Sequence, residues 1–226
     1  MLNKYIRCFW WLAIIINCFC IQPIANAGEF IAGEHFKELH APKISSFQFL
    51  DVSNNDKLTT NKPQVLMFFN YGCHGCWLIN KDFLAWQVAN KQRFNIVCVP
   101  VAFNDVWESL AKLYYVNQEL ILKDDNEEIF SSIHRDRKKL WLESEIVNFY
   151  AQKHIDPQKV LKSYHSFDVA RKVKKSIEAA SVYGVSVTPN VILNVAKNSY
   201  MINFTMVKNP ETLFKVIEYL IKEPPK

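Results

Sequence analysis

Cys73 and Cys76 are separated by two residues, at a point where an apolar run gives way to a helical pattern. Residues 65–69 are all apolar, which is typical of a strand that is covered on both faces. Residues 70–72 interrupt this run, and the apolar residues that follow recur with a period closer to that of a helix. We therefore expect Cys73 at the start of a helix and Cys76 one turn later on the same face.

Two cysteines in this position can close a small disulfide ring. The free N–H groups and the partial positive charge at a helix N-terminus favour the thiolate of Cys73, and a thiolate is the nucleophile of disulfide exchange. A zinc half-site and a pair of unrelated buried thiols are the alternatives. Zinc normally requires a second close pair of ligands. The remaining histidines and the one other cysteine beyond residue 27 repeat no such spacing: His35, His40, His134, His154, His165 and Cys98. We therefore predict a redox-active Cys73–Cys76 disulfide, with no other cofactor and no metal.

Residues 1–27 have the pattern of a cleaved Sec-type signal peptide. Lys4 and Arg7 give a positive start, residues 8–21 are mostly apolar, and Ala25-Asn26-Ala27 is a small-residue cleavage site. The apolar stretch is short for a membrane span of about 20 residues, so a retained anchor is the weaker alternative. We expect export to the periplasm, where disulfides form.

The composition narrows the class of protein. Three of the six cysteines lie in the signal peptide, which leaves one close pair and Cys98. This pattern indicates a protein that handles the disulfides of others rather than a disulfide scaffold. We expect Cys98 to be a buried small hydrophobe in a strand. A formal net charge of +5 is too small for a nucleic-acid-binding surface. The length of 226 residues suits one domain, or one domain that carries an insertion.

The rest of the chain alternates strand and helix patterns around a long helical stretch. We predict a strand over 95–103 that runs parallel to 65–69, because a helix lies between them. Apolar residues recur at helical spacing from 104 to about 171, and Asp156-Pro157 opens one of these helices. The other expected elements are a first strand at 47–52, a helix at 169–182, a hairpin of strands 191–195 and 200–204, and a last helix that starts at Asn209-Pro210.

A basic cluster lies inside the helical stretch and contains Arg135, Arg137, Lys138 and Lys139. Runs of charge of this kind most often form the solvated face of a helix, and we predict that arrangement here. A docking patch for a partner is the alternative.

Together these features resemble the periplasmic thiol:disulfide oxidoreductases of the DsbA type. The resemblance rests on the strand before the cysteine pair, on Cys73-His74-Gly75-Cys76, and on the segment 183–194, which contains Thr188-Pro189. It implies an α/β protein with a thioredoxin fold and an inserted helical subdomain. The implied parts are the signal peptide 1–27, a first thioredoxin-like part 28–104, the inserted helical subdomain 105–171 and a second thioredoxin-like part 172–226.

The resemblance also implies roles for five residues. Cys73 matches the attacking thiol and Cys76 the buried resolving thiol, and His74 is placed to stabilise the Cys73 thiolate. Pro189 matches a cis-proline that faces the cysteine pair, and Thr188 precedes it. The backbone at this proline would offer hydrogen bonds to an extended substrate segment.

Three departures from the family pattern bear on the redox properties. DsbA-type proteins typically have Pro-His between the cysteines, where this chain has His74-Gly75. Met67 stands where the family usually places a buried acid. Thr188 resembles the isomerases of the DsbC and DsbG type, although too few residues precede Cys73 for their N-terminal dimerisation domain.

The resulting hypothesis is a monomeric, exported protein disulfide oxidoreductase. It introduces disulfides into reduced or unfolded exported proteins, and the resemblance implies re-oxidation by a membrane, quinone-linked partner of the DsbB type. One alternative is a disulfide isomerase or reductase of the DsbC or DsbG type. The other is a non-enzymatic module that uses its thiols for metal binding or as a chaperone.

Overall fold

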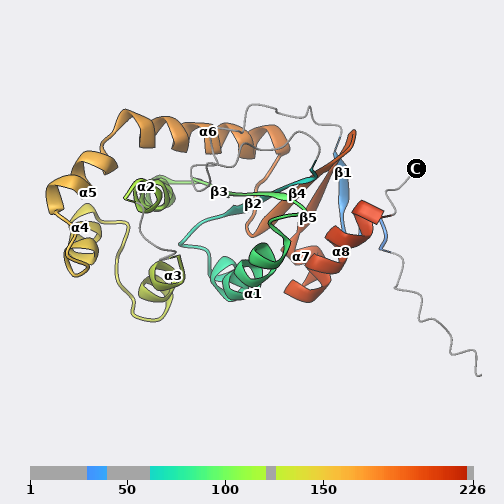
Figure 1. Ribbon diagram of the computed structural model, residues 1–226, viewed down its shortest axis with the longest axis horizontal. Coiled ribbons are helices and arrows are strands. Elements are labelled where there is room, and N and C mark those ends of the chain that lie inside the picture. Colours follow the sequence, from blue (N-terminus) through green and yellow to red (C-terminus); the bar gives the residue numbers. More distant parts are fainter. Residues whose placement is uncertain (1–29, 40–61, 121–125, 223–226) are drawn as a thin grey trace, which may run out of the picture.

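A computed structural model of the chain describes residues 30–39, 62–120 and 126–222. Its centre is a mixed sheet with helices on both faces, and a group of further helices lies at one end (Figure 1). The sheet has the strand order β1-β5-β4-β2-β3. The strands are β1 (Lys37–Leu39), β2 (Gln64–Phe69), β3 (Asn95–Pro100), β4 (Asn190–Val195) and β5 (Asn198–Asn203).

The central strand β2 has parallel and antiparallel neighbours. It runs parallel to β3, with Met67 opposite Cys98, and antiparallel to β4, with Met67 opposite Val191. The predicted parallel pair is therefore confirmed. Strands β4 and β5 form the predicted hairpin, and Ala196 in its turn has a positive φ of 46°. All five apolar residues of β2 are buried, as expected for a strand covered on both faces.

The first part of the chain differs from the sequence expectation. The predicted strand at 47–52 lies outside the described residues. A strand that was not predicted, β1, pairs antiparallel with β5 and forms an edge of the sheet. It is three residues long and carries two charged side chains, Lys37 and Glu38.

The two faces of the sheet are covered by different helices (Figure 1). Helices α1 (His74–Asn90) and α8 (Pro210–Lys222) lie on one face, where Trp86 stacks on Phe214 with ring centroids 5.2 Å apart. The short α7 (Phe204–Val207) precedes α8. Helix α6 (Phe167–Tyr183) covers the other face, where Tyr183 contacts Phe68 of β2.

The predicted helical stretch is confirmed as a group of helices without a described strand. These helices are α2 (Asp105–Glu119), α3 (Asn126–His134), α4 (Glu143–Ala151) and α5 (Pro157–Tyr164). Asp156 caps α5 by accepting a hydrogen bond from the Gln158 N–H at 2.9 Å, and Asn209 caps α8 by accepting one from the Thr212 N–H at 2.8 Å. Helix α6 is continuous across residues 171 and 172, the boundary that we expected between the insertion and the second thioredoxin-like part.

Two local expectations were wrong. The basic cluster does not lie on a helix face, because α3 ends at His134 and residues 135–142 form a non-helical connection to α4. Cys98 is only half-buried rather than buried, since it lies in β3 at the edge of the sheet. None of the helices within the described ranges is long and apolar enough to cross a bilayer.

Candidate active site

The loop between β2 and α1 is fixed by the side chain of Asn70. This buried amide donates hydrogen bonds from Nδ2 to the carbonyl oxygens of Val101, at 2.7 Å, and Trp107, at 3.0 Å. Its Oδ1 accepts a hydrogen bond from the Gly72 N–H at 2.8 Å, and its backbone carbonyl accepts one from the Cys73 N–H at 3.0 Å. One side chain therefore ties the loop that leads to Cys73 to the beginning of α2.

Cys73 occupies the N-cap of α1, as predicted. Its backbone is extended (φ −85°, ψ 113°), and its Sγ accepts a hydrogen bond from the Cys76 N–H at 3.2 Å. The sulfur thus takes the place of the Ser or Asp oxygen that caps most helices. The Cys73 thiol also donates to the carbonyl oxygen of Thr188 at 3.5 Å. Both cysteines are free thiols, so the described state is the reduced dithiol.

The two thiols differ in acidity. The Cys76 thiol, which hydrogen-bonds to Cys73, is the main reason that the pKa of Cys73 falls from 9.0 to about 7. The Thr188 side chain and the N–H groups of Cys76 and Gly75 lower this pKa further, against the effect of burial. Burial raises the pKa of Cys76 well above its ordinary value, and the neighbouring Cys73 thiol raises it further. As the pH rises above about 7, the reduced pair therefore holds a thiolate at Cys73 and a thiol at Cys76.

The Thr188–Pro189 peptide bond is cis, as the resemblance implied. The segment lies against the first turn of α1, because a Cβ placed on Gly75 would be 3.2 Å from Pro189 Cδ and 4.0 Å from Cys73 Sγ. Four of the five predicted site residues therefore lie together: Cys73, Cys76, Thr188 and Pro189.

The fifth predicted residue, His74, is exposed and turns toward two other rings. Its imidazole is 5.4 Å from the Trp77 ring and 5.6 Å from the His134 ring, measured between centroids. The hydrogen bonds that lower the pKa of Cys73 come from Cys76, Thr188 and Gly75.

His134 is a site residue that the sequence analysis did not identify. As the last residue of α3, it hydrogen-bonds through Nε2 to the carbonyl oxygen of Tyr71 at 2.8 Å. Its ring is parallel to that of Trp77, with an interplanar angle of 7° and centroids 5.2 Å apart. Burial lowers the pKa of His134, so the ring is neutral at pH 7 and donates from Nε2. No spacing in the sequence indicates this contact, because it joins segments 63 residues apart.

Met67 is buried in β2. The resemblance places it at the position of a buried acid, and because a thioether carries no carboxylate, Met67 cannot accept the proton of Cys76. Within the described ranges, no group of three or more His, Cys, Asp or Glu side chains is arranged to hold a metal ion.

Comparison with known proteins identifies DsbA relatives. The thiol:disulfide interchange protein DsbA of Pseudomonas aeruginosa is 26% identical over 200 residues, which cover 88% of this chain and 88% of that protein. DsbA of Azotobacter vinelandii is 28% identical over 163 residues, covering 72% of this chain and 75% of the relative. No family model matches the chain.

Solved structures that resemble the fold of this chain are also DsbA proteins. The crystal structure of Pseudomonas aeruginosa DsbA has a TM-score of 0.75 and 25% identity, over 87% of this chain and 95% of that one. The oxidoreductase NmDsbA1 of Neisseria meningitidis has a TM-score of 0.68 and 20% identity, over 85% and 93% of the two chains, and this likeness concerns the fold alone. The thioredoxin fold with a helical insertion is therefore confirmed, and an isomerase of the DsbC or DsbG type is not favoured.

Proposed function

We propose how this chain works from one premise: it is a DsbA-like thiol:disulfide oxidoreductase that introduces disulfide bonds into other proteins. The observation that carries the proposal is the difference between its two thiols. Cys73 has its pKa lowered to about 7 at the N-cap of α1, whereas burial raises the pKa of Cys76. Because the reduced form contains a stabilised thiolate, the Cys73–Cys76 disulfide should accept electrons readily.

The first step is attack on the oxidised protein. A substrate thiolate attacks Cys73 Sγ, a bond forms between the two sulfurs, and the Cys73–Cys76 bond breaks. Cys76 leaves with the electron pair and takes up a proton, because its environment disfavours the thiolate. Attack on Cys73 rather than Cys76 follows from burial, since the Cys76 residue is only 2% exposed and Cys73 is 8% exposed.

The second step releases the oxidised substrate. A second substrate thiolate attacks the substrate sulfur of the mixed disulfide, and Cys73 leaves as a thiolate. A thiol with a low pKa is a good leaving group, so the lowered pKa of Cys73 favours this step. The substrate has lost two electrons and the cysteine pair has gained them.

Thr188, Pro189 and His74 assist in this scheme. The Thr188 carbonyl oxygen lies 3.5 Å from Cys73 Sγ, and the backbone at this position pairs with an extended substrate segment. His74 forms an exposed rim beside Cys73 together with Trp77, and there it contacts the substrate.

The cellular setting is also a proposal. The signal-peptide pattern of residues 1–27 supports export to the periplasm, and exported proteins with reduced thiols are the substrates. The likeness to DsbA proteins supports re-oxidation by a membrane, quinone-linked partner of the DsbB type. The chain acts as a monomer, which light scattering after size exclusion would test.

One pair of measurements tests the proposed function. The oxidised protein is mixed with a reduced protein that contains several cysteines, and disulfide formation is followed by mass spectrometry. The equilibrium of Cys73–Cys76 with glutathione is measured in parallel. We expect stoichiometric transfer of disulfides and an oxidising potential. A potential near about −270 mV, which is typical of reducing thioredoxins, would contradict the proposal. In the Cys76→Ala variant, Cys73 is first converted to a mixed disulfide by oxidised glutathione; a substrate thiolate should then displace glutathione, and the mixed disulfide between the substrate and Cys73 should accumulate.

A further inference from the structure

The connection between α3 and α4 carries an excess of positive charge. Directly after His134 come four cations and one carboxylate, Asp136, which give this segment a net charge of +3, compared with +5 for the whole chain. We refer to residues 135–139 as the basic loop. The side chains of Arg135, Arg137 and Lys139 are exposed, and Lys138 is half-buried.

The basic loop starts next to His134, which contacts residues on both sides of Cys73 in the chain, Tyr71 and His74. His134, which precedes it, hydrogen-bonds to the Tyr71 carbonyl at 2.8 Å, and its ring is 5.6 Å from the ring of His74. His74 is the neighbour of Cys73 in the chain. Because each residue adds at most about 3.6 Å, the basic loop extends no further than about 18 Å from His134. A substrate segment of about five extended residues, anchored by its cysteine at Cys73, spans a similar distance.

The loop has a fixed backbone. The N–H groups of Arg135 and Asp136 donate to the Ser131 carbonyl at 2.9 and 3.0 Å, and the Lys138 N–H donates to the Ser132 carbonyl at 2.9 Å. Arg137 has a left-handed conformation, with a φ of 59°, in the manner of a helix C-terminal cap. Buried Ile133 and Leu140 anchor the two ends. A rigid surface loses little conformational entropy when it binds a ligand.

Most cations of the basic loop have no carboxylate partner. Arg135 pairs with Asp136 at 2.8 Å, whereas Arg137, Lys138 and Lys139 form no ion pair with any residue in the described ranges. These three charges are therefore available to an acidic partner.

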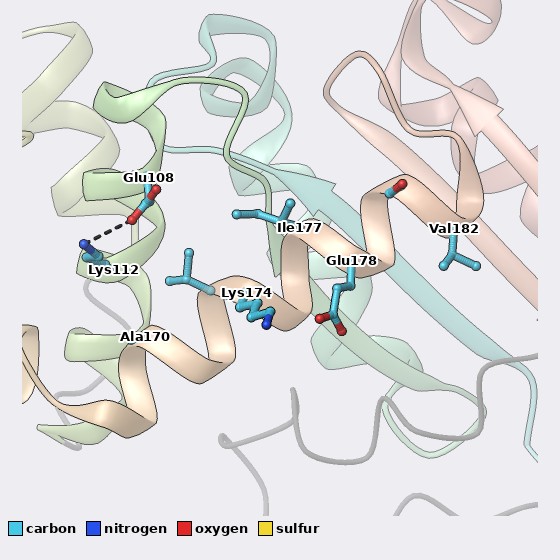
Figure 2. A pocket seen from close by; sticks show the side chains of 9 residues that line it. Glu108, Lys112, Ala170, Lys174, Ile177, Glu178 and Val182 are labelled. Carbon is cyan, nitrogen blue, oxygen red and sulfur yellow. Dashed lines mark ion pairs between the residues drawn. The ribbon is translucent and has the colours of Figure 1, made fainter.

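The basic residues of α6 provide a contrast. Three of its four cations are paired: Arg171 with Asp168 at 2.8 Å, Lys172 with Glu119 at 3.3 Å and Lys175 with Glu178 at 3.0 Å. Helices α6 and α2 line a groove of about 580 Å³, and Lys174 and Glu178 lie one turn apart on α6 along it (Figure 2). The positive charge of α6 is therefore largely neutralised within the protein, whereas that of the basic loop is not.

We propose that the basic loop is a docking surface for an acidic segment that flanks the cysteine of a reduced protein substrate. This inference rests on the proposed function and specifies a substrate class for the same site. Aspartate or glutamate within about five residues of the substrate thiol pairs with Arg137, Lys138 and Lys139 while the thiolate attacks Cys73. Attraction between exposed charges acts mainly on the association rate, and salt screens it.

The test compares two peptides with single-turnover kinetics. Both contain the same pair of cysteines, and the four residues on each side of the pair are glutamate in one peptide and glutamine in the other. At low ionic strength, oxidised wild-type protein should oxidise the glutamate peptide about tenfold faster than the glutamine peptide. Salt at about 0.5 M should remove most of this advantage. In the variant Arg137→Asn/Lys139→Gln the advantage should be lost, while the glutamine peptide reacts at the wild-type rate. Asparagine is chosen at 137 because it tolerates a left-handed backbone.

The matched control is Lys174→Gln/Lys175→Gln, which removes the same charge from α6 and should keep the preference. Equal rates for both peptides with the wild-type protein would overturn the docking surface and leave the proposed function standing. A preference that persists in the loop variant would overturn it as well. Loop-dependent binding to vesicles of anionic phospholipid, without a peptide preference, would assign the loop to a membrane surface instead. Failure to oxidise either peptide would overturn both proposals.

Discussion

The sheet with α1 and the inserted helices contribute to the active site in different ways. The sheet side supplies the groups that touch sulfur: the N–H of Cys76 and the carbonyl of Thr188. The inserted helices touch the loop before Cys73. Trp107 accepts a hydrogen bond from Asn70, and His134 donates one to the Tyr71 carbonyl. The comparison separates two contributions, because the turn at the N-terminus of α1 lowers the pKa of Cys73 and the inserted helices hold the loop that leads to it.

The largest expected effect is on the sheet side. Cys73→Ser should abolish disulfide transfer, because serine can cap α1 but cannot form the mixed disulfide. The measurement is disulfide formation in a reduced substrate protein. Cys98→Ser is the matched control, since it removes a half-buried thiol from β3 and should leave the rate unchanged. Transfer by the Cys73→Ser variant would refute the assignment of the nucleophile.

The free energy of unfolding of the reduced protein should depend on pH through the ionisation of Cys73. The folded pKa of Cys73, about 7, lies below the value of 9.0 for an unperturbed thiol. The thiolate therefore adds stability that is complete above pH 9 and is lost as the pH falls through 7. We expect the free energy of unfolding to rise by about 2 kcal/mol between pH 6 and pH 8.5 in urea titrations, relative to Cys73→Ser. Equal pH profiles for the two proteins would show that the thiolate is not stabilised.

Asn70→Ala should weaken the connection between the two regions. The change leaves the carbonyls of Val101 and Trp107 without their donor in a buried position, at a cost of about 2 to 3 kcal/mol in the free energy of unfolding. The control is Glu218→Gln, which breaks an exposed pair with Arg93 and should cost less than about 1 kcal/mol. Similar losses for the two variants would mean that Asn70 does not join the regions.

The smallest expected effect comes from His134. His134→Phe retains a ring against Trp77 but removes the donor to the Tyr71 carbonyl, whereas His134→Gln retains a donor and removes the ring. If the hydrogen bond positions the loop, alkylation of Cys73 near pH 6.5 should slow by about two- to fivefold in His134→Phe and less in His134→Gln. The pH profile of alkylation should shift upward in the same order. The opposite order would assign the effect to stacking.

The sheet side was predictable from the sequence to a large extent. An unbroken apolar run identified β2, the interruption after it placed Cys73 at a helix start, and Asn209-Pro210 marked the start of α8. The edge strand β1 was missed because three residues with two charges have no apolar period, and only pairing with β5 defines them as a strand. The cis bond before Pro189 was expected from resemblance alone.

The contribution of the insertion was predictable only as a run of helices. Apolar residues at helical spacing on both sides of the basic cluster led us to expect a helix there, but α3 ends at His134, and the left-handed Arg137 turns the chain after it. The cluster of cations was therefore assigned to a helix face instead of a loop. His134 reaches Tyr71 across 63 residues of sequence, and a contact of this range depends on how α3 is seated against α1. Local patterns carry no such information.

Gly75 has a consequence for attempts to tune this protein by exchanging its inter-cysteine dipeptide. Any other side chain at 75 begins with a Cβ that would lie 3.2 Å from Pro189 Cδ, so the proline ring would have to yield by a few tenths of an ångström. The dipeptide and the proline opposite it are thus fitted to each other across two distant stretches of the chain. A Pro-His dipeptide, which the resemblance assigns to DsbA-type oxidases, would therefore displace the segment at Pro189 as well as change the sulfur chemistry, and the two changes would have to be engineered together.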